Sequence, residues 1–277
     1  MSNTFEWAGR SIVWRAAGDG PAVVLCHGTP FSSEVWRPYA DALAADFTVY
    51  TWDMPGYGWS SKRPEDPVDF ASQAQAFAAL LDRWSLDRPR VIAHDFGGAV
   101  SLRAHLTLGV PYASLMLVDP VAIPPIGSPF FRFVAEHPAV LSELPGFIHE
   151  SVVQSYIRGA SHPGFTDAEL SALAAPWLDE AGRVAFYRQI ADFDEAYLEE
   201  IQRGCAAIDI PVQILWGEQD AWIPAEHGRR LAELIPGAGF ELIPGAGHLV
   251  QHDAPVVLAD RIRRWLTDGQ ASSRRGE

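Results

Sequence analysis

The sequence predicts an α/β protein with a doubly wound, mostly parallel sheet and a helical cap inserted after the sixth strand. Short apolar runs alternate with helical patterns, and several runs are apolar throughout, as expected of strands buried on both faces. From residue 122 to about 205 this alternation stops, and the chain becomes rich in proline and aromatic residues. We therefore expect a core of residues 1–121 and 206–269, a cap of residues 122–205, and a disordered tail at 270–277.

The first half of the chain contains the six strands that precede the cap. Residues 5–15 alternate around Gly9-Arg10, which predicts a hairpin of two edge strands. Buried strands and helices then follow in turn. Strands are expected at 22–26, 47–52, 90–94 and 113–118, and helices from residue 32 or 33, over 70–84 and after residue 95.

The second half begins with the cap, in which residues 183–197 have a helical pattern. The sheet pattern then resumes. Strands are expected at 211–216 and 240–243, and helices at 225–234 and 255–265. Right-handed crossovers bring the carboxyl ends of parallel strands to one edge, where such sheets bind ligands. We expect the cap to cover that edge.

Composition and charge exclude several classes of partner. The 277 residues carry a formal net charge of −14, which disfavours nucleic acid and anionic membranes as partners. No stretch is long and apolar enough to cross a bilayer, and the N-terminus lacks the pattern of a signal peptide. The two cysteines, Cys26 and Cys205, form no C-x-x-C motif. These features favour a cytoplasmic protein, and they leave open whether it is a monomer or a homodimer.

Residues 90–100, R-V-I-A-H-D-F-G-G-A-V, carry the main chemical signal. An apolar strand ends on Asp95, and a helical pattern starts after two glycines. The small residues Ala93 and Gly97 flank Asp95 two positions away on either side, as a very sharp turn requires. This is the spacing of a nucleophile elbow, with aspartate where serine is usual. The alternative is a buried aspartate that caps the helix.

Two further side chains would complete a catalytic triad with Asp95. His248 lies in a glycine loop after the last strand, where a backbone with little side-chain bulk can bring an imidazole over the site. The acid that orients this imidazole has two candidates. We favour Asp220, which follows the penultimate strand, over Asp119, which ends the strand before the cap and could be a turn residue before Pro120.

The position of the elbow also predicts an oxyanion hole. One donor is the backbone N–H after the nucleophile, here Phe96. The second is expected in the loop after His27-Gly28, most simply the N–H of Thr29, since Pro30 has no N–H.

The chain resembles the epoxide hydrolase and haloalkane dehalogenase branch of the α/β-hydrolase superfamily, from about residue 22 to residue 266. The motifs that carry this resemblance are H-G-T-P at 27–30, the loop 53–61, H-D-F-G-G at 94–98, W-G-E-Q-D at 216–220 and G-H at 247–248. The resemblance implies an α/β-hydrolase fold with Asp95 as nucleophile. The chain departs from both families at Phe96, where they usually carry tryptophan.

An aspartate nucleophile suits displacement at saturated carbon. Attack on a carbonyl would give a labile anhydride, whereas opening an epoxide or expelling a halide gives an alkyl-enzyme ester. His248 would then activate the water that hydrolyses this ester. A serine at the same position would serve esters, so the sequence disfavours an esterase.

The two leaving groups make different demands on the cap. Resembling epoxide hydrolases protonate the opening oxygen with two cap tyrosines, for which Tyr187 and Tyr156 are the best placed here. Resembling dehalogenases hold the halide with N–H donors, and Trp177 is one candidate, with Trp36 and Trp59 as others. We also place His27 among the substrate-binding residues.

The leading hypothesis is an epoxide hydrolase that acts on an apolar small molecule and gives a vicinal diol. The alternative is a haloalkane or haloacid dehalogenase with an atypical halide site. A third hypothesis is a non-catalytic ligand-binding member of the fold, since a fold alone implies no function. The proposed chemistry needs no cofactor and no metal.

Overall fold

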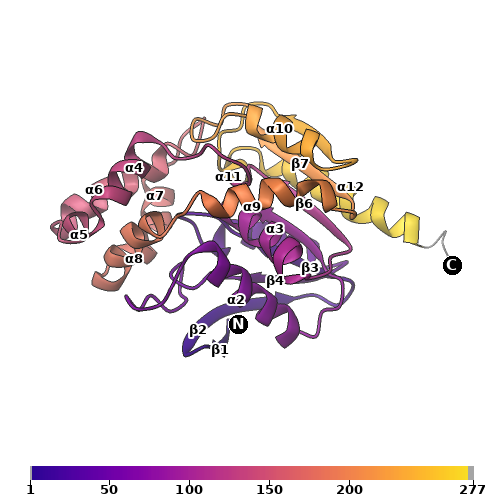
Figure 1. Cartoon of the computed structure of the whole chain (residues 1–277), viewed down its shortest axis with the longest axis horizontal. Coiled ribbons are helices and arrows are strands. Elements are labelled where there is room, and N and C mark those ends of the chain that lie inside the picture. The colour runs from indigo at the N-terminus through magenta and orange to yellow at the C-terminus, as the bar shows by residue number, and fades with distance from the viewer. Residues whose placement is uncertain (1, 274–277) are drawn as a thin grey trace.

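The computed structural model describes residues 2–273 and has the predicted fold class (Figure 1). Eight strands form one sheet in the order β1-β2-β4-β3-β5-β6-β7-β8. The strands are β1 (Asn3–Trp7), β2 (Arg10–Ala17), β3 (Ala22–Cys26), β4 (Thr48–Trp52), β5 (Arg90–His94), β6 (Ser114–Val118), β7 (Val212–Gly217) and β8 (Gly239–Ile243).

All strand pairs from β4 to β8 are parallel, and the antiparallel pairs are β1 with β2 and β2 with β4. Of the two hairpin strands, β1 alone lies at the edge, because β2 also pairs with β4. The central strands β3, β5 and β6 are buried along nearly their whole length, which explains their continuous apolar sequences.

Helices cover both faces of the sheet. On one face, Phe77 of α2 stacks on Trp52 of β4 with ring centroids 5.4 Å apart. On the other, Leu258 and Ile262 of α12 share a buried cluster with Val23 of β3. The helices of the core are α1 (Arg37–Leu43), α2 (Phe70–Arg83), α3 (Phe96–Leu108), α9 (Ala196–Gly204), α10 (Glu226–Leu234), α11 (Val250–Asp253) and α12 (Pro255–Ser273), with short 3₁₀ turns η1 (Ser33–Trp36) and η3 (Cys205–Ala207).

The cap is a group of helices set to one side of the sheet (Figure 1). Its elements are α4 (Pro129–Glu136), α5 (Pro138–Ser142), α6 (Gly146–Arg158), α7 (Asp167–Ala174), the 3₁₀ turn η2 (Ala175–Trp177) and α8 (Glu180–Ala191). The cap follows β6, as the sequence predicts.

The single helix predicted over residues 183–197 is in fact two helices. α8 ends at Ala191, and α9 starts at Ala196, whose backbone N–H is bound by the Asp194 carboxylate at 2.9 Å. Asp194 therefore starts a new helix rather than continuing the old one.

The predicted cap boundary at residue 205 also differs from the structure, because α9 packs on the core helix α3. Arg103 of α3 forms an ion pair with Glu200, and its guanidinium lies 4.4 Å from the ring centroid of Tyr197. The cap therefore ends before α9. At the C-terminus, α12 includes residues 270–273, which the sequence assigns to a disordered tail, and residues 274–277 lie outside the described residues.

Within residues 2–273, no helix combines the length and the apolar character needed to cross a membrane. The carboxyl ends of the parallel strands meet at one edge of the sheet, as expected for this topology. His27, Asp53, Asp95 and Asp119 each follow directly on a strand that ends there. The candidate site is built at this edge.

Candidate active site

Asp95 stands at the sharp turn between β5 and α3. Its backbone has φ 50° and ψ −120°, a conformation that costs energy for a residue other than glycine. The turn is held by close packing. A Cβ on Gly28 would lie 2.3 Å from the Asp95 Cβ, and a Cβ on Gly97 would lie 2.5 Å from the His27 carbonyl oxygen. Only glycine fits at either position, so the strained turn depends on both.

The Asp95 carboxylate is buried and faces two different groups with its two oxygens. Its Oδ1 accepts a hydrogen bond of 2.6 Å from the backbone N–H of Thr29. Its Oδ2 lies 3.2 Å from Nε2 of His248. That contact lacks hydrogen-bond geometry, and Nε2 has no hydrogen-bond partner among the described residues. One side of the imidazole is therefore available for proton transfer.

Asp220 holds the other side of the His248 ring. Its Oδ2 lies 2.8 Å from Nδ1 of His248, and both side chains are fully buried. Its Oδ1 accepts hydrogen bonds from the backbone N–H groups of Trp222 and Ile223, at 2.8 and 3.0 Å. The structure thus brings Asp95, His248 and Asp220 together in the arrangement of a catalytic triad.

His94 contacts the loop that carries His248. Its Nε2 lies 3.0 Å from the His248 carbonyl oxygen, and the two rings pack with centroids 4.9 Å apart. Burial, together with the charge on His248, lowers the pKa of His94 to about 3. His94 is therefore neutral, and its Nε2–H donates to the carbonyl.

The pKa of His248 lies well above its usual value. Burial lowers it, but the charges of Asp220 and Asp95, with the hydrogen bond to Asp220, together outweigh this effect. The resting site therefore contains an imidazolium between two carboxylates. Whatever neutralises one of these carboxylates removes part of the cause, so the pKa of His248 falls and the neutral imidazole, the form that can accept a proton, is favoured.

Asp119, the second candidate acid, lies beside this pair without bonding to the imidazole. Its Oδ1 accepts from the Gly217 backbone N–H at 2.8 Å, and its Oδ2 has no partner among the described residues. Burial, followed by the charge of Asp220, raises the pKa of Asp119 well above its usual value. Asp220, and not Asp119, is therefore the carboxylate bonded to His248.

Ligand atoms of Asp119, Asp220 and His248 lie within 4.8 Å of one another, a spacing that suits a metal ion. A cation bound there would displace the 2.8 Å hydrogen bond between Asp220 and Nδ1 of His248. The raised pKa of Asp119 also disfavours it as a ligand, because metal ligands must be deprotonated. The donor set therefore fits proton transfer better than metal binding.

The cap fixes the Thr29 side of the predicted oxyanion hole through Gln189, which the sequence analysis missed. Gln189 belongs to α8 and is buried, and its Oε1 accepts from the hydroxyls of Thr29 and Tyr57 at 2.7 and 2.8 Å. Its Nε2 donates to the Phe186 carbonyl at 3.1 Å. No sequence signal distinguishes such a glutamine from one on the surface of a helix.

The opposite donor, the N–H of Phe96, lies in the first turn of α3, where backbone N–H groups have no partner within the helix. The Phe96 side chain contributes apolar surface, and its ring meets Phe70 edge-on at 4.7 Å between centroids.

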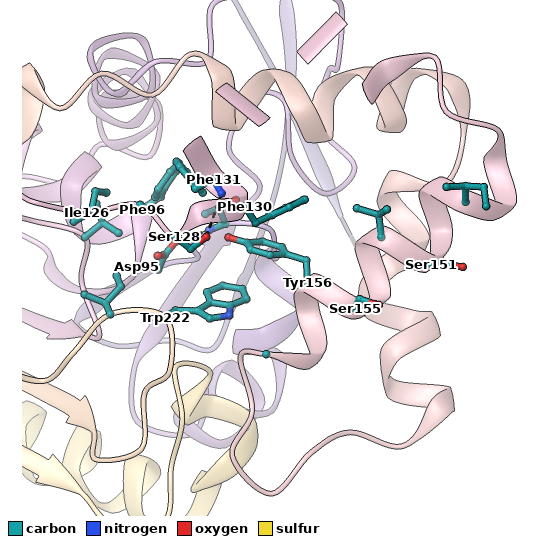
Figure 2. Close-up of a pocket in the computed structure, with 17 residues that line it drawn as sticks. Asp95, Phe96, Ile126, Ser128, Phe130, Phe131, Ser151, Ser155, Tyr156 and Trp222 are labelled. Carbon is teal, nitrogen blue, oxygen red and sulfur yellow. Dashed lines mark hydrogen bonds between the residues drawn. The ribbon is translucent and has the colours of Figure 1, made fainter. Parts of the chain in front are cut away.

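A cavity of about 580 Å³ lies between Asp95 and the cap (Figure 2). Tyr156 of α6 stands in it with its hydroxyl directed toward Asp95, and the structure records no hydrogen bond from this hydroxyl to another described residue. Its ring stacks on Trp222 with centroids 4.5 Å apart, and Trp222 in turn packs on His248 at 4.8 Å. Burial, with a smaller contribution from the Asp95 charge, raises the pKa of Tyr156. The hydroxyl therefore keeps its proton.

Three predicted substrate-binding residues do not line this cavity. Tyr187 is fully buried within the cap, and its hydroxyl lies 3.0 Å from Nδ1 of His149. The indole N–H of Trp177 donates to the Pro30 carbonyl at 2.7 Å, and Nε2 of His27 accepts from the Met54 backbone N–H at 3.0 Å. Each polar group already has a partner, so these residues hold the structure together.

The other tryptophans considered as halide donors are also placed elsewhere. Trp36 is buried and its indole N–H donates to the Cys26 carbonyl at 3.0 Å, and Trp59 is 61% exposed. The tryptophan that does line the cavity is Trp222, which the sequence analysis did not single out. Its place two residues after Asp220 is the signal that would have found it.

Replacing Gln189 with leucine should destabilise the protein, because two buried hydroxyls would lose their acceptor. We expect the free energy of unfolding to fall by about 3 kcal/mol, since each unsatisfied buried group costs about 1–3 kcal/mol. Denaturant unfolding of Gln189→Leu and of Gln154→Leu, a glutamine paired with Glu150 on the outside of α6, measures the difference. Equal losses in the two variants would contradict the structural role of Gln189.

Comparison with known proteins agrees with this architecture. The sequence model of the alpha/beta hydrolase family matches residues 23–261. An alpha/beta hydrolase fold protein from Burkholderia ambifaria is 47% identical, with a TM-score of 0.91 over 94% of this chain and 96% of that one. Bifunctional epoxide hydrolase 2 of Sus scrofa is 25% identical over 288 residues, which span 90% of this chain and 52% of that protein. A haloalkane dehalogenase from Bradyrhizobium elkani has the same fold, with 19% identity and a TM-score of 0.81 over 98% of this chain and 99% of that one. The chain belongs to the alpha/beta hydrolase family.

Proposed function

We propose that this hydrolase opens epoxides of apolar compounds through an ester on Asp95 and releases vicinal diols. The observation that carries the proposal is Tyr156. Its hydroxyl stands in the cavity above Asp95, keeps its proton and is not bound to another described residue (Figure 2). An epoxide held between the two would meet a nucleophile on one side and an acid on the other.

In the first half-reaction, Oδ2 of Asp95 attacks an epoxide carbon and the carbon–oxygen bond of the ring breaks. The hydroxyl of Tyr156 gives its proton to the released oxygen. Asp95 becomes a neutral ester, so the pKa of His248 falls, and the proton that the imidazolium loses replaces the one that Tyr156 gave away. The enzyme then holds a hydroxyalkyl ester, a neutral imidazole and a neutral tyrosine.

In the second half-reaction, Nε2 of His248 takes a proton from water, and the hydroxide adds to the ester carbonyl. The N–H groups of Thr29 and Phe96 stabilise the oxyanion. The intermediate then expels the diol oxygen, which takes the proton that the added hydroxide has left on the carboxyl group of Asp95. Asp95 is again a carboxylate beside an imidazolium. All atoms and protons balance as one epoxide and one water giving one diol.

The tryptophans considered from the sequence do not supply a halide site. The indole N–H groups of Trp177 and Trp36 are bound to backbone carbonyls, and the nucleophile is followed by Phe96 rather than by a tryptophan. A halide expelled at Asp95 would find the Tyr156 hydroxyl and, of the indoles, that of Trp222, which lines the cavity. We keep the dehalogenase as the competing outcome of the following experiment.

The His248→Gln variant should accumulate the Asp95 ester, because it lacks the base for the second half-reaction. Intact-mass spectrometry after incubation with an epoxide should show a gain of the whole epoxide mass. The same gain should be absent in a variant that also carries Asp95→Asn. A gain of the alkyl group alone from a bromoalkane would instead indicate a dehalogenase, and no adduct from either reagent would remove Asp95 as nucleophile.

Tyr156→Phe should lower kcat for epoxide opening by at least about 100-fold, the usual contribution of a general acid. The matched control is Tyr187→Phe, which removes a buried hydroxyl of the same cap that does not reach the cavity. Diol release measured for both variants separates the two roles. Similar kcat values in the two variants would mean that Tyr156 donates no proton.

The raised pKa of His248 should depend on the charge of Asp95. In Asp95→Asn the imidazole loses one of its two carboxylates, so its pKa should fall toward the ordinary value of about 6.5. NMR titration of the imidazole in both proteins measures this shift. The ion pair stabilises the folded protein below about pH 6.5, and this contribution is lost as the pH rises through the raised pKa. An unchanged pKa in Asp95→Asn would show that Asp220 alone sets it.

A further inference from the structure

The cavity extends from the reacting centre along one face of helix α6. Its lining positions on this helix recur every three or four residues, singly or as adjacent pairs, which places them in one row along the axis. These positions are Ile148, Ser151, Val152, Ser155 and Tyr156, followed by Gly159 just after the helix. The cavity therefore follows α6 for most of the length of the helix (Figure 2).

The two ends of this row differ in exposure and surroundings. At the inner end, Gly159 packs so closely on Trp222 that a Cβ there would lie 2.9 Å from the indole nitrogen, and Trp222 packs on His248. At the outer end, Ile148 is 39% exposed and adjoins Phe147, which is 71% exposed. The eight residue steps from Tyr156 to Ile148 span about 12 Å along the helix, roughly the length of a saturated chain of ten carbons.

The walls beside this row are almost entirely apolar. Across from α6 stand Ile126, Phe130 and Phe131, and Asp95 is the only charged residue of the described chain that lines the cavity. The hydroxyl of Ser151 is already bound to the Phe147 carbonyl at 2.9 Å. A tail along this row would therefore contact mainly apolar side chains, with the hydroxyls of Ser128 and Ser155 as the polar exceptions.

The floor beneath Asp95 is closed. Thr29, Phe96, Val121 and Ile223 all line the cavity and are each less than one-tenth exposed. A substrate chain therefore cannot extend beneath Asp95, whereas the row along α6 offers it a continuous path. An epoxide whose chain follows that path has its ring at one end of the chain.

We propose that the substrate is a terminal epoxide with a long unbranched alkyl chain, which lies along α6 and ends near Ile148. This inference rests on the proposed epoxide chemistry at Asp95. It adds that α6 makes binding depend on the length of the alkyl chain, because each turn of the helix contacts a further stretch of that chain.

A series of terminal epoxyalkanes from butane to dodecane tests this dependence on chain length. Each added methylene should lower KM about twofold to fourfold, the range expected for partial to full burial of that group, while kcat stays level. The gain should cease near ten carbons, where the chain passes Ile148. Diol formation with a KM that does not depend on chain length would overturn the inference and leave the proposed function intact.

Substitutions along this row of α6 residues test which of them the alkyl chain of the substrate contacts. Ile148→Asp should remove the gain over the last carbons only, whereas Val152→Thr, which keeps the shape of the side chain, should weaken the gain from the middle of the series onward. The control is Phe147→Asp, which places the same charge next to Ile148 at a residue that does not line the cavity. If Phe147→Asp and Ile148→Asp change the series equally, the chain does not lie along this row.

A binding measurement separates this inference from the catalytic proposal. Calorimetric titration of the Asp95→Asn variant with straight-chain alcohols needs no turnover. If affinity rises with chain length but the wild-type enzyme makes no diol, the chain binds along α6 and the epoxide chemistry is rejected. If affinity does not depend on chain length, the alkyl chain does not lie along α6, whether or not the enzyme opens epoxides.

Discussion

The site depends on a balance of three buried charges, one imidazolium between two carboxylates. A lone buried charge is expensive, and a buried pair with one partner removed is strongly destabilising. Here His248 is fully buried, with Asp220 at 2.8 Å on Nδ1 and Asp95 at 3.2 Å from Nε2. The net charge of the group is −1, and backbone N–H groups of Thr29, Trp222 and Ile223 bind the carboxylates. The loops that carry these N–H groups are held in place by the same charges that they stabilise.

This balance also explains why the nucleophile stands on a strained turn. The carboxylate has to reach the Thr29 N–H and the imidazole at once, and the left-handed conformation of Asp95 brings it there. Gly28 and Gly97 leave the room that the turn needs. The energy stored in the backbone at Asp95 is offset by the contacts on both sides of its side chain.

The sheet and the elbow could be predicted from sequence because they depend on local patterns. Continuous apolar strands, the glycines around Asp95 and the loops after the strands follow from burial and backbone geometry, which neighbouring residues report. The order of Asp95, Asp220 and His248 along the chain had the same basis, since each follows a strand that ends at one edge of the sheet.

The cap side chains could not be predicted in this way. Tyr156 and Tyr187 are both tyrosines on cap helices, and the sequence cannot distinguish the one that faces the cavity from the one that binds His149. Likewise, Trp177 and Trp222 differ only in which backbone or ring lies next to them after folding. The helical pattern in the sequence continues past the end of α8, so it predicts one helix where the structure has two. The break lies at Asp194, whose carboxylate binds the N–H at the start of α9, and the apolar periodicity gives no sign of it.

The hydrogen bonds of Gln189 divide the cap into two parts with different freedom to vary. Helix α8 is tied through this residue to the loop that carries Thr29, whereas α6 contributes Tyr156 and lines the space that a ligand fills. Substitutions on α6 that leave Tyr156 unchanged can change what the enzyme accepts while the reacting groups stay in place. Exchanging the whole cap with that of a relative would also exchange the acceptor that holds Thr29. New specificities are therefore most readily obtained by grafting α6 with Tyr156 retained and with α8 left in place.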